Sequence, residues 1–151
     1  MYIYKLTKLI TKKTSKMNYW HIQMALPQGR GEIRIDSSLL LKEDAPVIST
    51  GEWDNFQCRD FKNKIQIGDI VCVRDGKKPI ALCKVIGDNF TDANLSSKYL
   101  NINFRLVEVL EFYTGEDSFP QAQGTLRRAI DKNTSTWQFI NNWYKSTEIK
   151  K

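Results

Sequence analysis

The segment from residue 51 to residue 58, GEWDNFQC, gathers side chains that bind planar molecules well. The indole of Trp53 offers a broad face for stacking, and the carboxamides of Asn55 and Gln57 form hydrogen bonds with polar edges. Neither strand nor helix periodicity calls for a large ring at Trp53. Two interpretations stay open: Trp53 is a core anchor that closes one end of a sheet, or it faces a ligand.

Side chains in known catalytic arrangements are scarce. His21 is the single histidine of the chain, and at a strand start we interpret it as partly buried with its hydrogen bonds satisfied. The sequence contains no HExxH motif, no Cys/His cluster, no GxSxG elbow and no GxxxxGK[ST] loop, so we expect neither a metal nor a cofactor. Glu52, Asp54 and His21 are the acid–base candidates near Trp53, and their spacing favours none of them. We therefore expect a protein that is not an enzyme.

The net charge of +6 is unevenly distributed along the chain. Residues 1–18 contain five lysines and no acid. Subtracting these five from the 23 basic residues leaves 18 against 17 acidic ones. The pI of about 9.2 therefore comes largely from the N-terminal extension, which either binds phosphate non-specifically or is merely solvated. Nucleic-acid recognition by the rest of the chain would need a specific pocket.

Length and composition indicate one soluble domain. The chain of 151 residues is long enough for a single core, and 41% hydrophobic with 26% charged residues is typical of globular proteins. No apolar run approaches the roughly 20 residues that cross a bilayer, and the basic start lacks a secretory signal pattern. The three cysteines form no CxxC pair, so we expect buried free thiols in a reducing cytoplasm. The expected divisions are an extension over 1–17, a domain over 18–147 and a tail over 148–151.

The apolar pattern predicts an α+β fold with a small, curved, mostly antiparallel sheet or barrel flanked by short helices. Strands are expected over 18–26 and 101–113, with a hairpin over 66–87 that turns at DGKK. Helices are expected over 36–44, 55–64, 125–131 and 135–145. Residues 45–54 are expected to form a loop or short strand, and residues 88–100 a polar loop with room for a helical turn. Three further tryptophans are expected to pack in the core: Trp20, Trp137 and Trp143.

The order of these segments resembles the EVE domain family. The motifs that carry the resemblance are YWHIQM in the first strand, GEWDNFQCRDFK in the following loop and helix, and IQIGDIVCVRDGKKPIALCKVIGD in the hairpin. Together with RLVEVLEFY and FINNWYK, the pattern is similar to the N-terminal recognition domain of McrB-type restriction motor proteins. The resemblance covers residues 18–113 and, more loosely, 120–146. It implies a PUA-like fold of the EVE and YTH type, whose pocket takes a single flipped-out base.

The resemblance also implies which residues form this pocket. Trp53 stands where the leading pocket tryptophan of the family stands, and the backbone of Asp54 contributes beside it. Gln23 and Met24 match positions that line the pocket floor. Asn55 either contacts the base edge or caps the helix that follows, and capping does not exclude base contact.

The second aromatic wall is expected in the loop after CKVIGD. Phe90 is the first candidate for this wall and Tyr99 is the second, although Phe90 follows a strand and is equally a core candidate. Here the sequence departs from the three-tryptophan cages of YTH proteins. Four basic residues in expected loops are candidates to hold phosphates: Arg30, Arg34, Lys77 and Lys78.

The resemblance implies that the domain recognises a modified base in DNA by base flipping. We expect this modification to be a methyl group. Unstacking a base costs a few kcal/mol, and stacking on an aromatic face returns about 1–3 kcal/mol. Such a domain would be the sensor of a modification-dependent restriction system, fused to or associated with a motor NTPase and a nuclease. Two alternatives stay open: a domain that binds modified RNA, and a module that binds a peptide or small ligand.

Overall fold

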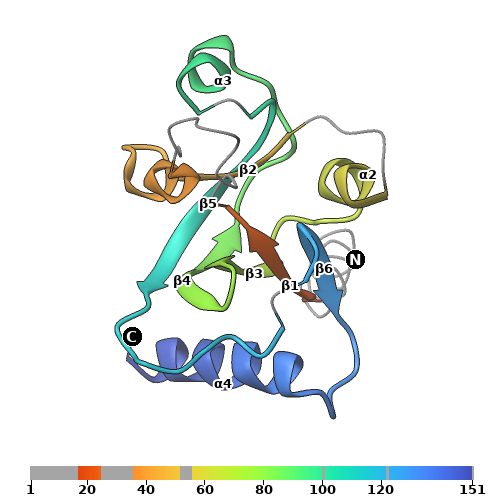
Figure 1. Ribbon diagram of the computed structural model, residues 1–151, viewed down its shortest axis with the longest axis vertical. Coiled ribbons are helices and arrows are strands. Elements are labelled where there is room, and N and C mark those ends of the chain that lie inside the picture. The colour runs from red at the N-terminus through yellow and green to blue at the C-terminus, as the bar shows by residue number, and fades with distance from the viewer. Residues whose placement is uncertain (1–16, 25–35, 52–55, 100, 122, 151) are drawn as a thin grey trace, which may run out of the picture.

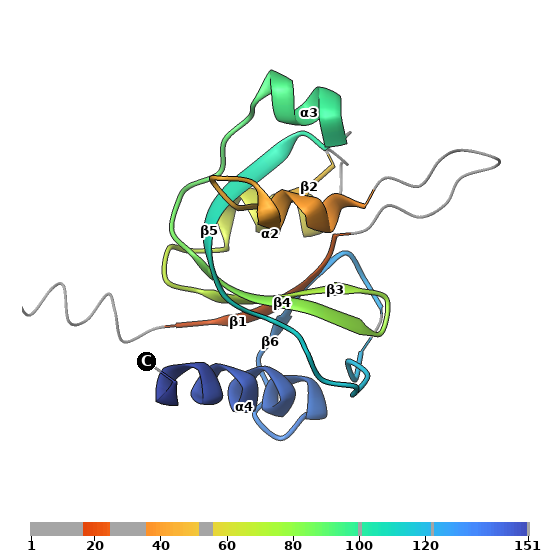
Figure 2. The same ribbon diagram turned by 90° about the vertical axis from the view of Figure 1, so that its left-hand side faces the viewer.

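The computed structural model of the chain describes residues 17–24, 36–51, 56–99, 101–121 and 123–150. These residues form a fold of three layers. Helix α4 (Ser135–Ile149) covers one face of a curled sheet (Figure 1). On the other side lie the 3₁₀ helix η1 (Ser37–Lys42) and the helices α2 (Phe56–Asn63) and α3 (Ala93–Tyr99), as Figure 2 shows. The sheet therefore buries side chains on both of its faces.

Six strands of the described chain form one sheet in the order β2-β5-β4-β3-β1-β6. All neighbours are antiparallel except β1 and β3, which are parallel. The first half of β5 pairs with β2 and its second half with β4, and register shifts in β3–β4 and β4–β5 add to the curl. The expected α+β fold is confirmed. The strands are β1 (Tyr19–Gln23), β2 (Val47–Thr50), β3 (Ile70–Asp75), β4 (Lys78–Val85), β5 (Asn103–Phe112) and β6 (Leu126–Ala129).

The expected hairpin over 66–87 is formed by β3 and β4, which are joined at Gly76 and Lys77. Gly76 has a φ of +60°, a conformation that glycine adopts without steric cost. Val71 and Val73 pack toward η1 and α2, whereas Ile70 and Cys72 pack toward α4. Because both faces of β3 are covered, its sequence reads as one apolar run rather than an alternation.

The tryptophans outside residues 52–55 pack as expected. Trp20 is 1% exposed, and its indole N–H donates a hydrogen bond of 2.9 Å to the buried carboxylate of Asp69. Trp143 of α4 is buried against the sheet, and Trp137 of the same helix packs against the same cluster. The three cysteines are free and buried, which confirms the expectation for their side chains.

Strand β6 corrects the expectation of a helix over 125–131. Its residues pair antiparallel with β1, with Tyr19 opposite Ala129. The segment LRRA consists of good helix formers, so local propensity favours a helix. The open edge of β1 and the burial of Leu126 outweigh that propensity. The last expected helix is confirmed as α4, whose first turn is capped by the Thr134 side chain.

Candidate nucleic-acid interface

The loop expected to hold the base lies between β2, which ends at Thr50, and α2, which begins at Phe56. The structure describes the residues on both sides of this loop. The predicted site residues that lie outside the described residues are Trp53, Asp54, Asn55, Arg30 and Arg34.

A cluster of buried polar groups forms around Ser49 and Gly51, at the end of β2 and directly before residues 52–55 in the sequence. The side-chain amide of Asn101 donates a hydrogen bond of 2.7 Å to the hydroxyl of Ser49. The amide of Asn103 and the thiol of Cys58 each approach the carbonyl oxygen of Gly51 at 3.5 Å. Buried polar groups carry a desolvation cost unless they are hydrogen-bonded, and these groups satisfy one another. We call Ser49, Gly51, Asn101 and Asn103 the polar cluster.

Met24, one of the two predicted floor residues, lies against this cluster. It is 2% exposed, and its sulfur accepts the backbone N–H of Ser49 at 3.4 Å. Phe90 is half-buried and pairs with Phe104 of β5, with ring centroids 5.8 Å apart. Tyr99 is buried, and its hydroxyl donates a hydrogen bond of 2.6 Å to Glu43. All three predicted residues thus pack in the core layer that also borders the polar cluster.

Gln23, the other predicted floor residue, uses its side-chain amide inside the fold. Its oxygen accepts hydrogen bonds from Arg74 at 2.9 Å and from the backbone N–H of Gly76 at 2.7 Å. Its nitrogen donates to the carboxylate of Asp75 at 3.0 Å. The Gln23 amide therefore points to the β3–β4 turn. The predicted phosphate contacts Lys77 and Lys78 are both exposed at this turn, beside the end of β1.

Arg74 is buried and holds three segments together. It donates hydrogen bonds to Nδ1 of His21 at 2.9 Å, to Gln23, and to the carbonyl oxygens of Gln123 and Gly124. These four acceptors are uncharged, and burial lowers the pKa of the guanidinium. Arg74 thereby fixes the segment before β6 against β1 and β3.

His21 is 1% exposed and hydrogen-bonded, as the sequence indicated. Burial, followed by the positive charges of Arg74 and Arg127, lowers its pKa to about 3, and a hydrogen bond with Gln121 opposes the shift. The ring is therefore neutral at pH 7. With Nδ1 already accepting from Arg74, His21 holds the fold together and is not poised as a general base.

Gln57 also has a use within the fold that the sequence did not reveal. Its side-chain oxygen accepts hydrogen bonds from the backbone N–H groups of Thr125, at 2.5 Å, and Leu126, at 2.7 Å. These contacts tie the first turn of α2 to the beginning of β6. The interpretation that Gln57 contacts a base edge therefore competes with a structural role for the same oxygen.

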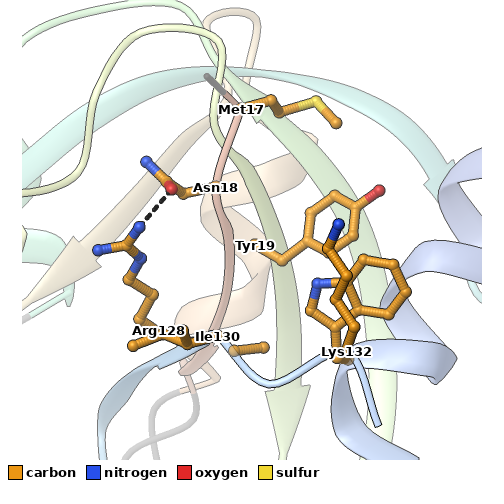
Figure 3. Close-up of a pocket in the computed structure, with 8 residues that line it drawn as sticks. Met17, Asn18, Tyr19, Arg128, Ile130 and Lys132 are labelled. Atoms are coloured by element: carbon orange, nitrogen blue, oxygen red, sulfur yellow. Dashed lines mark hydrogen bonds between the residues drawn. The ribbon is translucent and has the colours of Figure 1, made fainter. Parts of the chain in front are cut away.

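Two grooves flank β6, and the sequence analysis did not anticipate them. The first has a volume of about 420 Å³ and begins at Phe56, which is 58% exposed immediately after residues 52–55. The second, of about 280 Å³, lies toward α4 (Figure 3). The only sequence signal for them was the Arg-Arg pair in a segment expected to be helical. Residues that line both grooves are Arg128, Ala129 and Ile130.

The described residues show neither a metal-binding cluster nor a membrane-spanning helix. Their histidine, cysteine and acidic side chains form no group of three or more that would hold a metal ion. In the same part of the chain, no helix combines the length and apolarity that a membrane span requires.

Comparison with known proteins shows a fold likeness to a solved structure. No protein-family model matches the sequence, and no curated protein sequence matches it. The fold is similar to that of human THYN1 in a crystal structure of that protein in complex with 5-methylcytosine-containing DNA. The TM-score is 0.55 at 11% sequence identity, over 83% of this chain and 96% of the other. This likeness supports the PUA-like α+β fold expected from the sequence.

Proposed function

We propose that this PUA-like domain recognises a modified base in DNA, bound in a pocket beside residues 52–55 after the base has left the helical stack. The observation that carries the proposal is the polar cluster, which lies buried directly before those residues. The fold likeness to a protein crystallised with 5-methylcytosine-containing DNA supports the same conclusion. The partner is therefore proposed to be DNA that carries a methylated base.

The proposed pocket divides the work of binding between stacking and hydrogen bonding. Trp53 supplies the stacking face, which returns about 1–3 kcal/mol against a flipping cost of a few kcal/mol. Asn55 and the backbone of Asp54 contact the base edge. Phe90 forms the second wall, and Tyr99 is the alternative for that place.

In this proposal the floor of the pocket is apolar at Met24. The sulfur of Met24 already touches Ser49 in the polar cluster, so a methyl group on the base would be buried next to a polarisable side chain. Gln23 shapes the floor through its bonds to Arg74 and Asp75. Basic side chains proposed to hold the phosphates near this end of the sheet are Arg30, Arg34, Lys77 and Lys78.

We further propose a place for the domain in a cytoplasmic, modification-dependent restriction system. The resemblance of the whole motif order, which includes RLVEVLEFY and FINNWYK, to McrB-type recognition domains supports this role. A sensor of this kind requires a motor NTPase and a nuclease, either fused to the chain or associated with it. The domain itself would read the base and catalyse no reaction.

Binding of short fluorescent duplexes tests the proposal. The duplexes carry 5-methylcytosine, N6-methyladenine or no modification, and single-stranded RNA with the same modified bases is measured beside them. One modified DNA duplex is expected to bind at least about tenfold tighter, a difference of about 1.4 kcal/mol. Trp53→Ala is expected to erase this difference while the circular dichroism spectrum is retained.

Two variants keep the result interpretable. Trp53→Phe retains an aromatic face and is expected to keep part of the discrimination even if Trp53→Ala unfolds. Ile149→Ala removes a side chain that is 84% exposed at the end of α4 and is expected to change nothing. Equal binding of all DNA duplexes, or preference for modified RNA, would overturn the proposal as stated.

A further inference from the structure

The two grooves beside β6 form one continuous surface. Arg128, Ala129 and Ile130 line both of them, so the surface runs from Phe56 in α2 around the end of β6 to Trp137 in α4. Ile130 is 71% exposed in the middle of this path. Figure 3 shows the part nearest α4. We call this surface the β6 band; its principal residues are Phe56, Arg127, Arg128, Ile130, Lys132 and Trp137.

Two of the three cations of the β6 band, Arg128 and Lys132, contact neutral neighbours. Arg128 donates a hydrogen bond of 2.6 Å to the side-chain oxygen of Asn18. The amine of Lys132 lies 5.9 Å from the ring centre of Trp137. None of the three cations forms an ion pair with another described residue. They are exposed at the surface, so a phosphate can reach them without displacing a carboxylate of the described residues.

Two acids also line the first groove, and they do not cancel this charge. Asp60 lies 3.4 Å from the amine of Lys64, one helical turn away. Asp131 accepts the backbone N–H of Asn133 at 2.9 Å, as part of the turn after β6. With Asp60 balanced by Lys64, the three cations face one remaining acid among the described residues that line this groove. The band is therefore positive, with apolar faces at both ends.

We propose that the β6 band binds the sugar–phosphate backbone of the DNA strand whose base enters the pocket at Trp53. This inference rests on the proposed function. Phe56 directly follows residues 52–55, so the first groove begins where the proposed pocket ends. Guanidinium groups bind phosphate oxygens strongly, and exposed rings contact sugars and bases beside them. The strand continues over Arg127 and Arg128 toward Lys132.

A different explanation exists for arginines at this position. Strand β6 is the outer strand of the described sheet, and charged side chains on such strands prevent pairing with other chains. That role predicts self-association when the arginines are removed and no change in DNA affinity. If the β6 band binds DNA, removal of the arginines lowers the DNA affinity and causes no self-association.

The test compares Arg127→Ala/Arg128→Ala with Lys84→Ala/Lys145→Ala over a series of salt concentrations. The control pair removes the same charge from β4 and from the second half of α4, and neither lysine lines a groove beside β6. Each variant is measured with a 5-methylcytosine duplex and its unmodified counterpart. The arginine pair is expected to weaken both duplexes at least tenfold at 0.1 M salt, with a salt slope smaller by about 1.8. The ratio between the two duplexes is expected to stay constant, because phosphates carry no information about the base.

The outcomes separate the two proposals. If the native protein discriminates but the arginine pair binds like the control pair, the β6 band is wrong and the pocket stands. A change in the ratio without a change in the salt slope also overturns the band. If the native protein does not discriminate, the proposed function fails, and a smaller salt slope for the arginine pair would still support the band as a phosphate-binding surface. Self-association of the variant with unchanged affinity would leave the edge-protection explanation in its place.

Discussion

Nδ1 of His21 accepts a hydrogen bond of 2.9 Å from Nε of Arg74, across the parallel pair of β1 and β3. Both side chains are buried, and neither faces a carboxylate in this contact. Arg74 also donates hydrogen bonds to the side chain of Gln23 at the end of β1 and to the carbonyl oxygen of Gly124 before β6. The contact therefore joins the proposed pocket floor to the β6 band, and it depends on a neutral imidazole.

Acidification is expected to destabilise the fold through His21. The pKa of this side chain is about 3 in the folded protein and 6.5 in its ordinary state. As the pH falls below 6.5 the unfolded chain binds a proton that the folded chain does not, so stability is lost progressively down to about pH 3. From pH 7 to pH 5 the free energy of unfolding is expected to fall by about 2 kcal/mol from this residue. Urea unfolding at the two pH values measures it.

His21→Asn is the matched variant for this experiment. Its side-chain oxygen lies near the position of Nδ1 and can accept from Arg74, but it does not titrate. The variant is expected to lose about 2 kcal/mol less than the native protein over the same pH interval. Parallel losses in the two proteins would assign the pH dependence to other groups.

The cysteines are expected to be inert in the folded protein. Burial raises the pKa of Cys72 to about 12 and raises that of Cys83 as well, and Cys58 is also buried. Since the thiolate is the reactive species, a chromogenic disulfide reagent at pH 8 should modify none of the three without denaturant and all three in guanidinium chloride. Rapid modification of one thiol in the native protein would contradict this account.

The sequence predicted those elements in which local pattern and tertiary environment agree. The hairpin of β3 and β4 is one such element, because a Gly76 turn separates two apolar runs that are both buried. Residues 126–129 are the opposite case. Their helix propensity is high, but they form β6 because β1 offers an open edge. No pattern within the segment reveals that edge.

The candidate site was less predictable for a related reason. A side-chain type shows what a residue is able to bind and not what it binds. Gln23 and Gln57 carry amides suited to a base edge, yet the structure engages the Gln23 amide with Arg74 and the Gln57 oxygen with β6. Asn101 and Asn103 read as ordinary strand residues, although they supply the polar cluster. These roles depend on contacts between segments about 45 to 70 residues apart.

Removing the side-chain oxygen of Gln57 is expected to loosen β6. Gln57→Ala leaves the backbone N–H groups of Thr125 and Leu126 without their acceptor, and each lost bond to a partly buried group costs about 1–3 kcal/mol. Because two groups lose their acceptor, urea unfolding should show a loss of about 2–6 kcal/mol.

Gln57→Glu retains an acceptor oxygen at the same position and should recover most of that stability. It also distinguishes a structural role from base contact. If Gln57 touches the base, the glutamate variant will change discrimination between modified and unmodified duplexes while remaining stable. Unchanged discrimination in the stable glutamate variant is the expected result.

Gly124→Ala is expected to affect stability and DNA binding together. Gly124 has a φ of +84°, which alanine adopts at a cost of roughly 1–2 kcal/mol. A Cβ at this position would also lie 2.6 Å from Nε of Arg127, so that side chain must move. The midpoint of thermal unfolding should fall by several degrees. The affinity for unmodified DNA should also fall, as it should in an Arg127→Ala variant.

Gly68→Ala is the matched control for this prediction, because Gly68 has a φ of +98° and a Cβ there meets no atom within 4 Å. It carries the backbone strain without displacing an arginine, so it should lose stability and keep its DNA affinity. Equal affinities in the two glycine variants would show that the position of Arg127 over Gly124 has no part in holding the strand.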